Sequence, residues 1–433
     1  MSEKKGQDGC RVKVWKQDPS VSKLGVRTSY IHTPVKPGPR DDKIVVANKP
    51  IRYSNGDGTF TKMKGVKTVG KNKKGDLMFS PKKELEKFDA VHTFAVVRQV
   101  VTMFERALRR MKISQSLEWQ WGKTPITIHP NAGYWDNAFY NRDWKALCFF
   151  SFYPGDDANK EMIYTCRSFD IIAHETGHAV LDSLRPGWYD DEAIVQTGAL
   201  HESFGDLTCI FLMLDQMDIC EAIIAESKGN LHKKFFFTII GEQFGKGLGY
   251  KLGLRNADNN LNLTKAGNEV HSLSRVFTGA VYDIMAGMFY SLREPDLHSQ
   301  AETLFRVGKH ICSLVIMAVL KSPYNNASFK DVAENMIKYE QDDPWKEKIR
   351  EEFSKRQVLG PNALKMNKHN KVKGFVKNCC VTMRHSKVPD NIDTVPKRKR
   401  KSSTSRGDSP KRKKKDNNSN KKKNKSRKPK NPK

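Results

Sequence analysis

Apolar residues recur at helical spacing through the middle of the chain, which predicts a largely helical central and C-terminal part. The first such stretch, residues 84–112, carries its apolar side chains on one face of a long amphipathic helix. The helix predicted over 200–217 is apolar on all sides, so we expect it to be buried. Further helices are predicted over 169–183, 270–292, 301–320 and 329–339.

The segments that flank this helical part have a different composition. Residues 1–85 are rich in Gly, Pro and Lys, with short β-type runs, and NGDGTF at 55–60 predicts a tight turn between two strands. Residues 125–155 are aromatic and end in a strand-like run. The helical periodicity fades after Leu359, and residues 385–433 are low-complexity sequence that we expect to be disordered.

Together these elements predict an α+β fold. A length of 433 residues suggests two or three domain-sized units, or one large enzyme with extensions. We expect four parts: a strand-containing N-terminal region at 1–85, a lobe at 86–185, a helical lobe at 186–359, and a basic low-complexity tail at 360–433.

Positive charge is concentrated at the C-terminus. Residues 397–433 hold nineteen basic and two acidic side chains, so this segment carries +17 of the net charge of +29. The clusters at 397–401 and 411–415, each preceded by proline, are typical of nuclear-import signals or polyanion-binding patches. No aromatic residue accompanies them, so nucleic-acid binding would be sequence-independent and salt-dependent. We expect an import receptor or nucleic acid as the partner of this tail; a purely solubilising tail is the alternative.

Targeting features are few. The N-terminus lacks the apolar segment of a secretory signal, and the longest apolar run, 311–320, is too short to span a bilayer. The eight cysteines show no CxxC pair and no repeated spacing, which favours reduced, buried thiols over disulfides. We therefore expect an intracellular protein without a membrane span, located in the nucleus if the cell is eukaryotic.

The main candidate for a metal-binding motif is the sequence His174-Glu175-Thr176-Gly177-His178. On a helix, positions i and i+4 share one face, so both imidazoles can hold one zinc ion. Glu175 then lies near the open coordination position and can activate a bound water. The preceding residues, 169–173, are mostly apolar, as a buried helix requires. The alternative is a helix with two unrelated histidines.

A zinc site of this kind needs a third protein ligand. One class of zinc peptidases has Gly three residues and His six residues after the second histidine, but Leu181 and Leu184 stand there. The other class takes a glutamate from a following helix, and Glu202 is placed to supply it. Asp206 lies one turn later and can accept the free N–H of a ligand imidazole. The alternative for both acids is a favourable interaction with a helix dipole.

Residues 88–339 resemble the thermolysin family of gluzincin metallopeptidases. In that family HExxH is followed by Gly-Ala-x-Asn-Glu-x-x-x-Asp, and the chain has GALHESFGD at 198–206, with His201 in place of Asn. Further similar motifs are NAFY at 137–140, IGE at 240–242 followed by LR at 254–255, and VHS at 270–272. The resemblance implies a thermolysin-like, two-lobed metallopeptidase with the zinc helix between the lobes.

The resemblance also implies roles at the reacting carbonyl. His271 and Tyr189 would stabilise the oxyanion, and Arg255 would contact the carbonyl next to the cleaved bond. Each has an ordinary alternative: His271 a helix-capping or core histidine, Tyr189 a packed aromatic, and Arg255 a structural ion pair.

Four further residues would hold the substrate by the same resemblance. Asn137 and Ala138 would bind its backbone, and Ile171 and Leu254 would line an apolar pocket for the residue after the cleaved bond. Asn137 could instead be a turn residue. The family's calcium site matches at Asp170 and Glu242.

Two departures from the family pattern stand out. Met213 replaces an acid of the calcium site, which leaves calcium binding open. Ala266 replaces the acid that orients the oxyanion histidine, and Asn268 or Glu269 could substitute for it.

The sequence therefore predicts a zinc-dependent endopeptidase that cleaves peptides or proteins by metal-activated water, before large apolar residues. The rival is a catalytically inactive protein of the same fold that binds proteins or nucleic acid through its substrate site and basic tail.

Overall fold

The computed structural model describes residues 9–190, 193–361, 363, 379–380, 389 and 392–396. The chain divides into a compact unit, residues 1–397, and a second unit, residues 398–433. The second unit and both basic clusters lie outside the described residues, so the expectations about the tail stay predictions.

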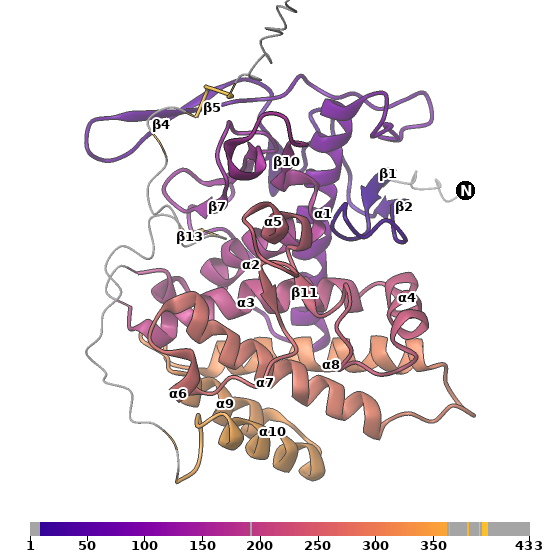
Figure 1. The fold of residues 1–433 in the computed structure, drawn as a ribbon, viewed down its shortest axis with the longest axis vertical. Coiled ribbons are helices and arrows are strands. Elements are labelled where there is room, and N and C mark those ends of the chain that lie inside the picture. Colours follow the sequence, from indigo (N-terminus) through magenta and orange to yellow (C-terminus); the bar gives the residue numbers. More distant parts are fainter. Residues whose placement is uncertain are drawn as a thin grey trace, which may run out of the picture. The chain divides into compact units, whose positions relative to one another are not determined.

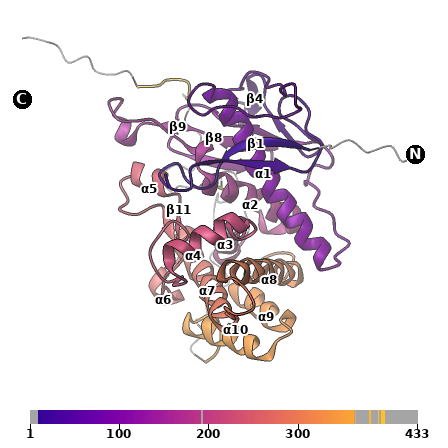
Figure 2. The ribbon, with the colours of Figure 1, turned by 90° about the vertical axis from the view of Figure 1, so that its right-hand side faces the viewer.

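One end of the compact unit is rich in strands, and the helices α7 to α10 lie at the other end (Figures 1 and 2). The α+β prediction is thus confirmed. Its main sheet has the strand order β13-β7-β8-β6-β3, with β3, β6 and β8 parallel and β7 and β13 antiparallel to their neighbours. These strands are β3 (Ile44–Val46), β6 (Ile126–His129), β7 (Ala138–Asn141), β8 (Ala146–Phe149) and β13 (Cys379–Cys380).

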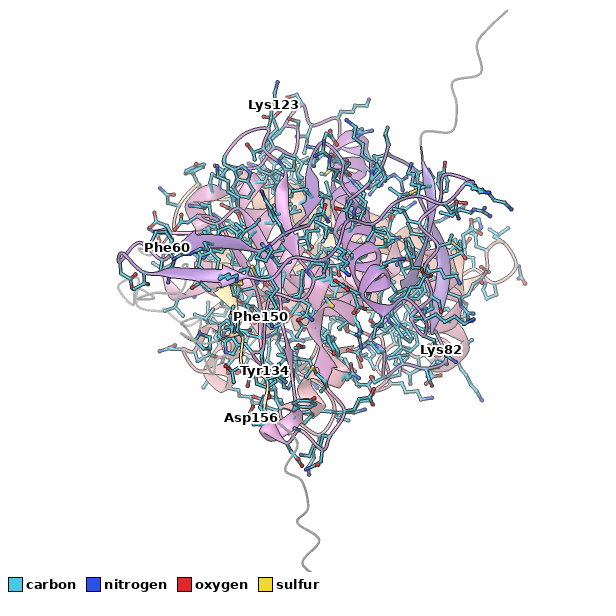
Figure 3. All side chains as sticks on the ribbon, turned by 90° about the horizontal axis from the view of Figure 1, so that it is seen from above. Phe60, Lys82, Lys123, Tyr134, Phe150 and Asp156 are labelled. Carbon is cyan, nitrogen blue, oxygen red and sulfur yellow. The ribbon has the colours of Figure 1, made fainter. Side chains whose placement is uncertain are left out.

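Four two-stranded ladders complete the described strands. The predicted turn at 55–60 joins β4 to β5, and exposed Phe60 lies at the side of the molecule in Figure 3. The ladders are β1 (Cys10–Trp15) with β2 (Val26–Ile31), β4 (Ile51–Ser54) with β5 (Phe60–Met63), β9 (Ser151–Phe152) with β10 (Ile163–Tyr164), and β11 (Ile239–Ile240) with β12 (Arg255–Asn256).

The helices fill the remainder of the described chain. They are α1 (Leu85–Arg110), α2 (Phe169–Leu184), α3 (Val195–Leu214), α4 (Met217–Ser227), α5 (Glu242–Gly247), α6 (Leu263–Ala266), α7 (Val270–Ser291), α8 (Gln300–Lys321), α9 (Phe329–Tyr339) and α10 (Asp343–Lys355), with 3-10 turns at Pro154–Asp156, Thr165–Arg167 and Pro186–Trp188.

The long predicted helices are present, but α3 begins earlier than predicted, and α4, α5, α6 and α10 were not predicted. Helix α3 begins at Val195, before the predicted residue 200, because tertiary hydrogen bonds hold its first turn: Thr197 donates to the Ala327 carbonyl, and Gln196 accepts from the Phe329 N–H. Helix α10 was not predicted, since most of its residues are charged and few are buried.

Helix α8 passes the length and composition test for a membrane span. Most of its apolar window is buried inside the protein, where the helix packs against α4 and α9. Burial of this kind is usual for a core helix. The six described cysteines outside β13 are free and buried, in agreement with the prediction of reduced thiols.

The site-bearing helices α2 and α3 pack against each other at the centre of the unit (Figure 2). Their close approach depends on two glycines. A Cβ at Gly177 would lie 2.7 Å from Thr208 Oγ1 and 3.1 Å from the Gly205 Cα, and a Cβ at Gly205 would lie 2.7 Å from the His174 ring. Phe204 anchors α3 to α1 by stacking on Phe104.

We predict that Gly205→Ala lowers the free energy of unfolding by about 1–3 kcal/mol, because the added methyl group overpacks this contact. The matched control is Gly287→Ala on α7, where an added Cβ meets nothing within 4 Å. The control should be neutral or stabilising by about 0.4–1 kcal/mol. Urea denaturation measures both, and equal stability of the two variants would contradict the packing argument.

Candidate metal centre

Helix α2 presents His174, Glu175 and His178 together on its inner face. Ser168 caps the helix by accepting the Ile171 N–H, which fixes where the helical turns begin. All three side chains are buried, and their ligand atoms lie close enough to share one ion.

Glu202 on α3 completes a converging set of ligand atoms. His174 Nε2 lies 3.0 Å from His178 Nε2 and 3.4 Å from Glu202 Oε2, while His178 Nε2 lies 3.6 Å from Glu202 Oε1. Tetrahedral zinc with bonds of about 2.0–2.1 Å places its ligand atoms roughly 3.3 Å apart. The donor set therefore fits zinc in both chemistry and spacing.

Each ligand histidine has a partner on its far nitrogen. Asp206 Oδ1 lies 3.1 Å from His174 Nδ1, the arrangement expected of an acid that orients a ligand imidazole. His178 Nδ1 lies 2.8 Å from His201 Nδ1. In the sequence, His201 stands out only as a departure from the family pattern, and its position next to Glu202 is the available clue to an orienting role.

Arg255 lies behind the ligands, on β12. Its Nη2 is 2.8 Å from Asp206 Oδ1, 3.3 Å from His174 Nδ1 and 4.0 Å from Glu202 Oε2. The ladder of β11 and β12 pairs Ile240 with Arg255, which explains why the IGE and LR motifs occur together. The structure thus places Arg255 in a buried ion pair beside the metal ligands.

Burial and neighbouring charges set the protonation of this group. Burial raises the pKa of Glu175 well above its usual value, as suits a general base. Burial alone would also raise the pKa of Glu202, but the charges of His271, His174 and His178 outweigh it and hold this pKa well below the usual value. Glu202 is accordingly an anion, the form that binds a metal.

The strand β7 contacts Glu175, the expected general base, through its backbone. Glu175 Oε2 accepts the Tyr140 N–H at 3.1 Å, while Glu175 Oε1 is buried without a hydrogen-bond partner in the described chain. Asn137 precedes the strand; its Oδ1 accepts the Ala138 N–H, and its buried Nδ2 is likewise unbonded among described atoms. The contact of Tyr140 with the base was missed, because a backbone hydrogen bond leaves no trace in residue types.

The expected oxyanion donors lie around the same centre. His271 Nε2 is 3.5 Å from Glu202 Oε2, and its Nδ1 is 2.9 Å from Glu269 Oε1, so Glu269 occupies the place of the missing acid. Burial lowers the pKa of His271, but Glu202 and Glu269 outweigh this and raise it overall. The Tyr189 hydroxyl donates to the Tyr140 carbonyl at 3.3 Å.

The two residues expected to line the specificity pocket lie on either side of Gly241. A Cβ built on Gly241 would be 3.3 Å from the Leu254 Cβ and 4.0 Å from the Ile171 Cγ1. Gly241 has φ +60°, which favours glycine, and a side chain at this position would contact both residues.

The calcium residues are arranged less favourably. Asp170 Oδ2 accepts the Gly241 N–H at 3.1 Å, and Glu242 is paired with Lys246. At the position of the missing acid, Met213 Sδ is contacted by Gln17 Nε2 at 3.1 Å. Calcium binding remains an unsupported prediction.

A second group of metal-ligating residues, His232, Asp258 and Asp283, lies near a cavity on the helical side. His232 is exposed, and Asp283 already forms a 2.6 Å ion pair with Arg356. It is therefore a weaker metal site than the buried set on α2 and α3.

Comparison with known proteins defines the class. Residues 43–182 match the family model of the thermolysin metallopeptidase catalytic domain. This match supports a relationship of the matched segment to the thermolysin family and, with it, a zinc-dependent peptidase function. No curated protein matches the sequence. Among solved structures, the precursor of protealysin, a metalloproteinase from Serratia proteamaculans, is 16% identical with a TM-score of 0.44, covering 68% of this chain and 83% of its own.

The family match ends at Asp182, so it contains His174, Glu175 and His178 but not Glu202 or any later residue. The expected roles of the residues on α3, β12 and α7 therefore rest on the similar motifs in the sequence and on their geometry.

We predict that Glu269→Gln lowers the pKa of His271 in the metal-free protein, because it removes a negative partner 2.9 Å away. Contacts with His271 hold the pKa of Glu269 at about 2 against the opposing effect of burial, whereas the pKa of His271 is raised. The pair thus stabilises the fold above the unfolded Glu pKa of about 4.3 and loses this effect as pH rises through the folded pKa of His271.

The stability cost of Glu269→Gln should accordingly be larger at pH 6 than at a pH where His271 is neutral. NMR titration of the His271 ring and urea denaturation at several pH values measure the two effects. Asn268→Ala is the matched control, and an equal fall of the pKa in that variant would contradict the assignment.

Proposed function

We propose that this protein is a zinc-dependent endopeptidase. The observation that carries the proposal is the convergence of His174, His178 and Glu202 at zinc-ligand spacing, with the unbonded oxygen of Glu175 beside them. Bound zinc would lower the pKa of a water molecule towards ~7 and polarise the peptide carbonyl.

The protein's own residues supply the remaining chemistry. Glu175, whose pKa is raised by burial, takes the proton of the attacking water and passes it to the leaving amine. His271, with its raised pKa, and the Tyr189 hydroxyl donate hydrogen bonds to the developing oxyanion. Asp206 and His201 hold the two ligand imidazoles in orientation.

Substrate binding follows from the surroundings of this centre. Asn137 and Ala138, at the start of β7, bind the peptide backbone. Ile171 and Leu254, which both lie near Gly241, form an apolar wall for the residue after the cleaved bond. Burial of a large apolar side chain there is favourable by ~25 cal/mol per Å², so cleavage occurs before Leu, Phe, Ile or Val. A peptide library tests this preference, which a profile dominated by Lys, Asp or Gly would contradict.

We predict that Glu175→Gln retains stoichiometric zinc but loses roughly 10²–10⁴-fold in peptide hydrolysis, because it removes the general base. Zinc content is measured by metal analysis, and hydrolysis with an internally quenched peptide. The matched control is Glu334→Gln on the exposed side of α9.

Full activity of Glu175→Gln, or loss of its zinc, would contradict the assigned role. A wild-type protein that binds zinc but cleaves no peptide in the library would favour the inactive, binding-only alternative.

A separate prediction concerns the tail, and it rests on sequence alone. Removal of residues 394–433 deletes both basic clusters and should leave hydrolysis of small peptides unchanged. It should abolish nuclear localisation in a eukaryotic cell and weaken salt-dependent DNA binding. Fluorescence imaging and DNA titrations at several salt concentrations compare the truncated and full-length chains. If localisation and DNA affinity are unchanged, solubilisation is the only one of these roles that remains for the tail.

A further inference from the structure

The outer edge of β7 is covered by a segment from far along the chain. Cys379 lies opposite Tyr140 and Cys380 opposite Phe139, in antiparallel pairing. Figure 1 shows β13 beside β7. Without β13, β7 would be the edge strand of the sheet and would expose unpaired backbone groups.

This edge borders the proposed catalytic centre. The Tyr140 N–H donates to Glu175, and the Tyr140 carbonyl accepts from Tyr189, so the residue opposite Cys379 contacts both the general base and an oxyanion donor. An extended peptide added antiparallel to an exposed sheet edge is a common mode of peptide recognition. β13 pairs with Phe139 and Tyr140, the two residues that follow Asn137 and Ala138 along the chain, so it lies along the edge to which a substrate backbone would add.

The chain is anchored again just after this segment. Ile392 packs into the small apolar cluster that contains Trp135, Phe139 and Phe150, and its carbonyl accepts the Tyr134 N–H at 2.7 Å. Tyr134 is held in turn by Asp156, its neighbour in Figure 3, through a 2.8 Å hydrogen bond. Gly133 allows this approach, since a Cβ there would lie 2.6 Å from the Ile392 carbonyl oxygen.

The sequence around β13 suits an apolar-preferring site. In a stretch otherwise rich in lysine, residues 375–383 read FVKNCCVTM, with one basic side chain. The described core continues to Leu359, twenty residues before Cys379, and Ile392 is buried twelve residues after Cys380, so β13 is tethered on both sides. A tethered segment has a local concentration on the order of millimolar.

We infer that strand β13, Cys379–Cys380, acts as an intramolecular competitor that occupies the peptide-binding edge of β7 and must leave before a substrate binds. This inference rests on the proposed function. The occupant is the chain itself, so the competition is independent of protein concentration and raises KM without changing kcat.

The test is the double variant Cys379→Pro/Cys380→Pro in the full-length protein, because proline cannot donate a backbone hydrogen bond to a strand. We expect KM for an internally quenched peptide with Leu after the cleaved bond to fall about tenfold or more, as a millimolar local competitor would raise it by that much. We expect kcat to stay within about twofold. The matched control is Thr394→Pro/Val395→Pro, at exposed positions beyond the Ile392 anchor, which should keep the wild-type KM.

Two further measurements separate this inference from the proposed function. In the Glu175→Gln background, fluorescence anisotropy gives the Kd of the labelled peptide, which should fall about tenfold with the proline pair whether or not the enzyme is active. A synthetic peptide of residues 374–385 should inhibit the proline variant competitively. Equal KM and equal Kd with and without the proline pair would overturn the inference while leaving measured peptidase activity standing. Tighter peptide binding without any cleavage would support the inference and overturn the peptidase proposal.

Discussion

The arrangement of the site depends on the contact between α2 and α3 at Gly177 and Gly205. Because neither residue has a side chain, the helix backbones approach until Gly205 touches the His174 ring, and Glu202 reaches the two histidines. A larger residue at either position would separate the ligands that each helix supplies. The Gly of the HExxH motif thus has a packing role beside the chemical role of its neighbours.

That contact also buries several charged side chains, and each of them needs a partner of opposite charge. Carboxylates in an apolar interior are costly unless they are paired. Asp206 is paired with Arg255 and His174, and Glu202 is surrounded by three histidines. Removing one partner would leave another charge buried alone, so the histidines, acids and arginine form one electrostatic unit. Arg255 therefore stabilises the charges of the expected ligand residues, and this role does not depend on whether it also contacts a substrate.

The elements predicted best from the sequence are the helices with clear apolar periodicity and the site residues whose motifs lie on those helices. The zinc-helix residues His174 and His178 lie on one face at a fixed spacing, and Glu202 follows on the next apolar helix, so their meeting was foreseeable. Helix α10 was missed because its charged surface hides the few residues it buries, and β13 was missed because a two-residue strand has no periodicity. The choice between Asn268 and Glu269 needed coordinates, since both precede His271 closely.

Interactions made by the backbone were the least predictable part of the site. Tyr140 binds Glu175 and Tyr189 through its own peptide groups, so any residue type at that position could make the same contacts. The same strand pairs with β8 on one side and β13 on the other. A peptide-binding strand must keep one edge free of permanent partners, yet a free edge invites pairing with any extended chain. A tethered segment that pairs only weakly with the edge satisfies both requirements. It covers the edge when no substrate is present, and it can leave when a substrate binds.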